Sequence, residues 1–143
     1  MIEAVDWAIE HRGEFGIRVI NMSLTSTVRG PASTDPLNAA VEEAWNRGIV
    51  VVAAAGNRGT GNGAMDYAPG NDPYVITVGA TDDQGTESRA DDTVAAWSSA
   101  GTTQEGVRKP DVFAPGAHIV STLARDSEFT RLCPSCIVDG QYI

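Results

Sequence analysis

Hydrophobic and polar positions alternate with two different spacings along the chain. Apolar residues recur at helical spacing in two segments, and short apolar runs rich in β-branched residues lie between and after them. We predict helices at residues 2–11 and 36–47, strands at 18–22, 49–55, 74–79 and 94–97, and a final strand pair at 117–123 and 137–142. Helices alternating with short strands indicate an α/β fold with a mainly parallel sheet flanked by helices.

The predicted helix at 36–47 has the clearest end signals. Asp35 stands at the N-cap, Pro36 occupies the first turn and Gly48 follows the last turn. The apolar residues on one face of this helix are Leu37, Ala40, Val41, Ala44 and Trp45. The next strand is short and rich in Val, so we expect it to be covered on both faces, as in parallel sheets.

The end of this strand is the most informative stretch of the sequence. Residues 50–57 read Val-Val-Val-Ala-Ala-Ala-Gly-Asn, so small side chains are followed by a single amide. Gly56 allows a sharp exit from the strand, and Asn57 could then direct an N–H donor at developing negative charge. The alternative is that Gly-Asn is present only because the pair suits a turn.

Composition and charge narrow the class of protein. The chain has 143 residues, of which 42% are hydrophobic, which indicates one folded domain. Its net charge is −9, with a single lysine among ten basic residues. This balance argues against nucleic acid and anionic membranes as partners, because both require clustered Lys and Arg. We interpret the acidity as favouring solubility outside the cell, and expect a secreted protein.

Two cysteines and three tryptophans remain. Cys133 and Cys136 form a Cys-x-x-Cys pair, which could be a redox site, half a zinc site or a local disulfide. The pair lies in a loop rather than between a strand and a helix, so we favour a disulfide formed in an oxidising compartment. We expect Trp7, Trp45 and Trp97 to pack in the core or along a groove rather than to stack on a ligand.

Three segments in a fixed order carry a family resemblance. Residues 19–24 read Val-Ile-Asn-Met-Ser-Leu, residues 50–57 are the strand and amide described above, and residues 109–116 read Lys-Pro-Asp-Val-Phe-Ala-Pro-Gly before an apolar run at 119–122. Together they closely resemble the subtilisin-like serine peptidases, or subtilases. The resemblance extends from residue 2 to residue 122 and implies a partial subtilisin-like fold.

The resemblance assigns roles to particular residues. Asn57 matches the amide of the oxyanion hole, and Ser23 and Leu24 match the strand that pairs with the substrate backbone. The wall of the pocket for the residue before the cut is matched by Ala54, Ala55 and Gly56. Thr25 stands where many subtilases have Gly, and its β-branched side chain should narrow this pocket.

The resemblance also has structural implications. It implies a cis bond between Ala68 and Pro69. It implies no cofactor and no dedicated metal ligand for the chemistry, and it allows a weak structural cation, calcium or sodium, held by backbone carbonyls around Gly70, Asp72 and Val75.

The catalytic triad of the family is not found in these residues. The Asp and His segments of subtilases precede the matched region, and the Gly-Thr-Ser segment follows it. His11, near a helix end, and His118, between apolar neighbours, are both interpreted as structural or solvent-facing. We therefore expect residues 1–143 to be the central part of a single catalytic domain, truncated at both ends, which associates with itself to cover an exposed sheet edge.

The resemblance thus implies a fragment of a serine endopeptidase that acts on peptide or protein substrates through an acyl-enzyme, and we expect the fragment to be inactive alone. The alternative is a non-catalytic peptide-binding remnant or dissected module. A nucleotide-binding α/β protein is a third class, suggested by the glycines at 56–63. Their spacing does not match Gly-x-Gly-x-x-Gly, and no Gly-Lys-Ser/Thr follows.

Overall fold

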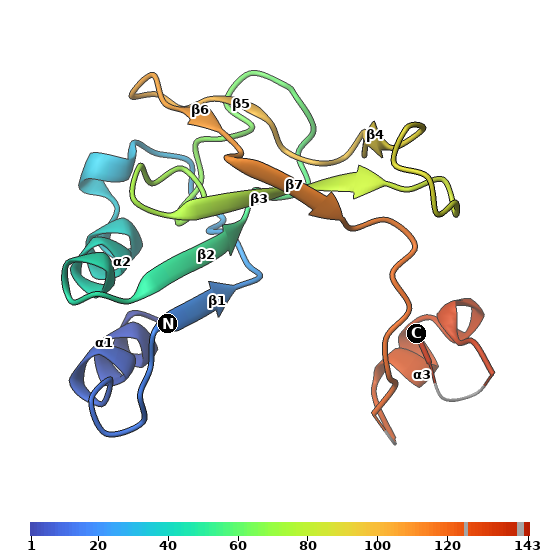
Figure 1. The fold of residues 1–143 in the computed structure, drawn as a ribbon, viewed down its shortest axis with the longest axis horizontal. Coiled ribbons are helices and arrows are strands. Elements are labelled where there is room, and N and C mark those ends of the chain that lie inside the picture. Colours follow the sequence, from blue (N-terminus) through green and yellow to red (C-terminus); the bar gives the residue numbers. More distant parts are fainter. Residues whose placement is uncertain (125, 140–141) are drawn as a thin grey trace.

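A central, mostly parallel sheet organises the chain in the computed structural model, which describes residues 1–124, 126–139 and 142–143. Its parallel strands are β1 (Val19–Met22), β2 (Val50–Ala54), β3 (Ile76–Asp82) and β7 (Val112–Pro115), and β4 (Thr93–Val94) runs antiparallel to the end of β3. The helices α1 (Ile2–Glu10) and α2 (Pro36–Asn46) lie together on one side of this sheet (Figure 1). The predicted α/β class with a mainly parallel sheet is confirmed.

Smaller elements complete the chain. β5 (Gly101–Thr102) and β6 (Arg108–Lys109) form a separate antiparallel pair. Short 3-10 helices span Ala32–Thr34 and Pro134–Cys136, and α3 (Phe129–Leu132) lies in the C-terminal segment that leaves the sheet after β7 (Figure 1). No helix within the described ranges is both long and apolar enough to cross a bilayer.

Helix α2 begins where the sequence predicted, after the N-cap residue Asp35. The Asp35 carboxylate accepts hydrogen bonds from the backbone N–H groups of Leu37 at 2.8 Å and Asn38 at 3.4 Å, which satisfies donors that a helix start leaves free. Gly48, beyond the end of the helix, has a φ of +81°, a conformation that glycine adopts without strain. The chain can therefore turn directly from α2 into β2.

The hydrophobic core lies between the two helices and one face of the sheet. Val41 and Ala44 of α2 are fully buried there, and Val5 and Ile9 of α1 join them. The sheet contributes alternate residues, such as Val51 and Ala53, which are 1% exposed. Burial of these side chains supplies the main driving force for folding this layer.

The opposite face of the sheet is not covered by the described chain. Val50 and Val52 of β2, predicted to be buried on that side, are only half-buried. In the same register lie Val19 of β1, Ile76 of β3 and Val112 of β7, which are 57%, 38% and 48% exposed. The prediction of a strand covered on both faces is therefore wrong for this chain, because both of its longer helices pack on the same side.

The sequence-based prediction is also wrong for the last strands. No strand forms at 117–123, and the nearest one is β7 at Val112–Pro115. Among the described residues, a single bridge, between Thr122 and Tyr142, joins 117–123 to 137–142. Residues 140 and 141 of that expected strand lie outside the described residues. The strand expected at 94–97 is limited to β4, because the chain turns at Ala96 and Trp97.

The tryptophans are not core residues. Trp7, Trp45 and Trp97 are 50%, 42% and 43% exposed, which corrects the prediction of core packing. Trp7 stacks on the imidazole of His11, with 4.3 Å between ring centroids. Trp97 does line a groove, as the alternative prediction for these residues allowed.

Candidate functional site

Parallel pairing brings two of the predicted segments to the same edge of the sheet. Met22 at the end of β1 lies opposite Ala53 in β2, so the residues that follow both strands leave the sheet side by side. An open hollow of about 430 Å³ lies there. Six of the seven predicted site residues border it: Ser23, Leu24, Thr25, Ala54, Gly56 and Asn57. Ala55, the seventh, is buried and borders the neighbouring hollow instead.

The neighbouring hollow, of about 410 Å³, lies on the uncovered side of the sheet. Residues from β2, β3 and the end of β7 form its floor, and Trp97 and Ser98 contribute to its wall. Asn57 borders both hollows and is exposed to solvent. Among the described residues, its side-chain amide has no hydrogen-bond partner. An unengaged N–H donor therefore stands at the rim that the two hollows share.

The conformation of Gly56 makes the exit from β2 dependent on glycine. Its φ is +102°, which residues with a side chain rarely adopt. A Cβ atom at this position would lie 3.0 Å from Nη1 of Arg58 and 3.2 Å from both Oγ of Ser99 and Cγ2 of Thr25. The turn that presents Asn57 is thus both sharp and tightly enclosed.

The loop that carries Asn57 is held by a segment about forty residues further along the chain. The Ser99 backbone N–H donates to the Gly56 carbonyl at 2.8 Å, and the Ser99 hydroxyl accepts from the Arg58 backbone N–H at 3.0 Å. The N–H of Gly59 donates to the Trp97 carbonyl at 2.9 Å. Ser99 is fully buried, so these bonds are shielded from water. Sequence reasoning missed Ser99, since an isolated Ser-Ser pair gives no specific signal.

Arg58 is a second residue that sequence reasoning missed. It borders the first hollow, and its guanidinium lies over the Tyr67 ring, 3.6 Å from the centroid. Nη1 donates to Thr25 Oγ1 at 3.1 Å, and Nη2 donates to the Ser26 carbonyl at 3.2 Å. Thr25 and Arg58 therefore meet at the edge of this hollow, and the narrowing of the pocket by Thr25 stays a prediction. Of the residues that border it, Arg58 alone carries a charge.

The predicted cis proline lies next to a residue that contacts the segment following β1. The Ala68–Pro69 peptide bond is cis, as the resemblance implied, and so is the Lys109–Pro110 bond, which was not predicted. The Ala68 carbonyl accepts a hydrogen bond from the Ser26 N–H at 2.6 Å. This contact fixes the segment that follows Ser23 and Leu24. Leu24 itself packs against the hydrophobic core while it borders the hollow.

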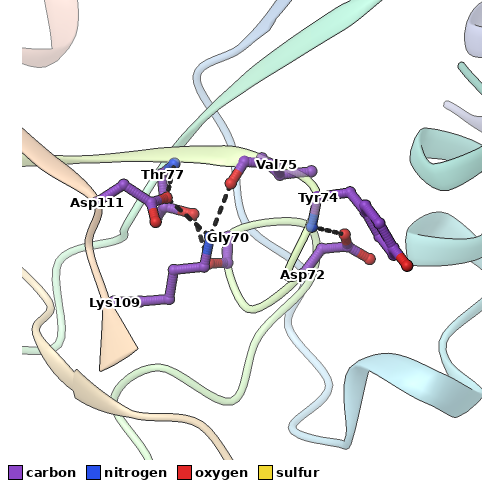
Figure 2. Close-up of polar contacts among 7 residues, drawn as sticks. All are labelled: Gly70, Asp72, Tyr74, Val75, Thr77, Lys109 and Asp111. Atoms are coloured by element: carbon purple, nitrogen blue, oxygen red, sulfur yellow. Dashed lines mark hydrogen bonds and ion pairs between the residues drawn. The ribbon is translucent and has the colours of Figure 1, made fainter. Parts of the chain in front are cut away.

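The loop expected to hold a weak cation is occupied by internal contacts. The Gly70 carbonyl accepts from the Thr77 hydroxyl at 2.8 Å, and the Val75 carbonyl accepts from Lys109 Nζ at 2.7 Å (Figure 2). No group of three or more His, Cys, Asp or Glu side chains that could hold a metal ion occurs in the part of the chain that the structure describes. Two of the three residues expected to offer carbonyls to a cation, Gly70 and Val75, therefore already accept internal hydrogen bonds.

Asp72 in the same loop is a buried carboxyl group. Burial raises its pKa to about 6. The backbone N–H of Tyr74, which donates to Oδ1 at 2.8 Å, lowers this pKa, the Glu42 carboxylate raises it, and the Lys109 ammonium lowers it slightly. Oδ2 of Asp72 is buried and has no partner among the described residues.

The two histidines lie away from both hollows. His11 Nδ1 is 2.8 Å from the Trp7 carbonyl at the end of α1, where the sequence placed it. The His118 side chain is 84% exposed and lies 3.9 Å from Asp82. Neither borders the hollows around Asn57. Cys133 and Cys136 are joined by a disulfide around the last 3-10 helix, as predicted.

Two open hollows thus lie at the carboxyl ends of the parallel strands, with Asn57 on the rim that they share. The chain belongs to the Subtilase family (Peptidase S8), whose model matches residues 1–137. It is 43% identical to the serine protease AprX of Bacillus subtilis (strain 168), over 99% of this chain and 33% of AprX. It is 40% identical to the thermophilic serine proteinase of Bacillus sp. (strain AK1), over 81% of this chain and 24% of that protein.

Solved structures agree with the family assignment. The S41 psychrophilic protease superposes with a TM-score of 0.61 and 30% identity, and sphericase with a TM-score of 0.64 and 28% identity. Each match covers 85% of this chain and 39% of the other chain. The chain therefore spans only about a quarter to two fifths of the length of these four relatives.

Proposed function

We propose that this chain is the central part of a serine endopeptidase that hydrolyses peptide bonds through an acyl-enzyme. In that reaction a Ser attacks the scissile carbonyl, a His takes its proton and an Asp orients the His, while the carbonyl oxygen gains negative charge. The Asn57 amide would donate a hydrogen bond to this oxygen. The observation that carries the proposal is the unengaged Asn57 amide on the rim shared by the two hollows.

The substrate would lie along the residues that follow β1. Ser23, Leu24 and Thr25 are not part of a strand, and their backbone groups have no backbone hydrogen bond within the described residues, which leaves them available to pair with an extended peptide. The side chain before the cut would enter the hollow between Ala54, Gly56 and Thr25. The absence of larger side chains at residues 54–56 supports a close approach of the peptide backbone.

The triad itself would come from segments of the parent outside residues 1–143. His11 and His118 do not border either hollow, so neither is a candidate for the general base. We expect the isolated chain to bind peptides weakly and to turn none over. A non-catalytic peptide-binding remnant would behave in the same way, and only the gene distinguishes it.

We also propose that the parent works outside the cell on peptides or proteins. A net charge of −9 and the Cys133–Cys136 disulfide support an oxidising, extracellular setting, and the charge argues against nucleic acids or anionic membranes as partners. The uncovered face of the sheet supports self-association of the isolated chain.

Sequencing the gene on both sides of this frame tests the proposal. We expect an Asp and a His segment upstream and a Gly-Thr-Ser segment downstream. Stop codons in their place would favour the binding remnant. Turnover of a chromogenic peptide by the isolated chain, lost in Asn57→Ala, would contradict the division of the site between this chain and the missing segments.

A further inference from the structure

Lys109, the single lysine of the chain, is buried, and its ammonium has two oxygen partners. Its side chain is 1% exposed. Its ammonium donates to the Val75 carbonyl at 2.7 Å and to Asp111 Oδ2 at 2.7 Å (Figure 2). A charge so deeply buried is retained only where its partners compensate for the water it has lost. These two oxygens provide that compensation.

The partners of Lys109 are themselves fixed. Asp111 Oδ2 also accepts the Thr77 backbone N–H at 2.7 Å, and the Asp111 N–H donates to the Thr77 carbonyl at 2.9 Å. The Thr77 hydroxyl donates to the Gly70 carbonyl at 2.8 Å. The ammonium thus connects the loop before β3 to the residues that enter β7.

The Lys109 ammonium lies at the loop in which a weak cation was expected. Of the three residues expected to offer carbonyls, Val75 holds the ammonium and Gly70 holds a hydroxyl. A metal ion beside Val75 would face a unit positive charge at hydrogen-bond distance from the same oxygen, and the two cations would repel each other. We propose that the Lys109 ammonium replaces the metal ion as the resident cation of this loop, so that the chain folds here independently of calcium and sodium.

The test compares thermal unfolding of the 143-residue chain in EDTA, in calcium and in sodium, with magnesium at matched ionic strength as the control for general screening. Wild-type protein should show the same Tm in all of them and no saturable heat when calcium is titrated in. In EDTA, Lys109→Met should lower the Tm by roughly 5 °C or more. Because the carboxylate of Asp111 then faces the Val75 carbonyl without a counter-charge, calcium or sodium should restore part of this loss.

Arg108→Met is the matched control, because it removes a neighbouring positive charge that is exposed to solvent. It should leave the cation response unchanged. Lys109→Gln, which keeps a donor for Val75, replaces the methionine variant if that variant does not fold. Saturable calcium binding by the wild type, or a Lys109 variant whose Tm no cation raises, would overturn the proposal. If neither variant folds, the wild-type titration decides alone.

Discussion

The hydroxyl oxygen of Ser99 accepts a hydrogen bond from the backbone N–H of Arg58 at 3.0 Å. With the bond from the Ser99 N–H to the Gly56 carbonyl, this contact holds both neighbours of Asn57. Asn57 therefore has a fixed backbone although its side chain is exposed. A backbone held in this way reduces the ordering that the Asn57 side-chain amide would need in order to donate to an oxyanion, the role proposed for it.

Ser99→Ala should release this loop. The Arg58 N–H loses its acceptor in a partly buried site, which should lower the free energy of unfolding by roughly 1–3 kcal/mol. Hydrogen exchange at the Arg58 amide should accelerate, and denaturant unfolding should report the loss of stability. Ser88→Ala is the control, since the Ser88 hydroxyl accepts from the Ala90 N–H at an exposed site. Equal effects of the two variants would contradict the role given to Ser99.

Arg58 should favour acidic side chains before the cut. Its guanidinium is the one charged group among the residues that border the first hollow. In the parent enzyme, Arg58→Gln should lower the ratio of kcat/KM for glutamate over leucine substrates by about two- to fivefold, as for a partly exposed ion pair. Arg18→Gln, at the opposite end of β1, should leave the ratio unchanged. An unaltered ratio in Arg58→Gln would show that the charge does not reach the substrate.

Asp72 should make stability fall as pH rises. Its folded pKa, raised to about 6, lies above its ordinary value, so the folded state binds the proton more tightly. The resulting stabilisation is complete at low pH and is lost as pH increases through about 6. Glu42 and Lys109 are the charged groups that face it.

The measurement is urea unfolding between about pH 4 and pH 7. Asp72→Asn, which keeps an acceptor for the Tyr74 N–H, should reduce the fall in stability over this range. Asp6→Asn, on the exposed side of α1, should not change it. A steeper fall in Asp72→Asn would contradict the sign of the shift.

The uncovered sheet face should promote self-association of the isolated chain. Val112 in β7 is 48% exposed on this face, and a lysine there should weaken association by repulsion and loss of apolar contact. Sedimentation velocity over a range of concentrations should detect a shift towards monomer in Val112→Lys. Val28→Lys, at a 71% exposed loop position, is the control. A wild-type chain that stays monomeric at all concentrations would refute the expectation.

The parts of the fold that follow from local signals were predictable. Asp35 and Gly48 mark both ends of α2 within a few residues of sequence, and the small residues before Asn57 mark the end of β2. β7 was missed because Pro110 and Pro115 leave only a short apolar run between them. The strand tolerates Pro115 because, within the described part of the chain, it pairs on one side only, with β3, and needs no N–H on the other.

The contacts that complete the site were not predictable. Arg58 reaches Thr25 from 33 residues away, Ser99 reaches Arg58 from 41, and Lys109 reaches Val75 from 34. No local period encodes such pairs, since they depend on how the strands are arranged in space. The exposure of Trp45 has a related cause: it lies at the margin of the apolar face of α2, where it approaches Tyr74 rather than the sheet.

Turnover by the parent enzyme with Asn57→Ala tests the central claim most directly. We expect kcat to fall by about 10²–10³, the value known for loss of the corresponding donor in subtilisin itself, with little change in KM. Asn62→Ala, in an exposed part of the same loop, should retain full activity. An unchanged kcat in Asn57→Ala would contradict the assignment of Asn57 to the oxyanion hole.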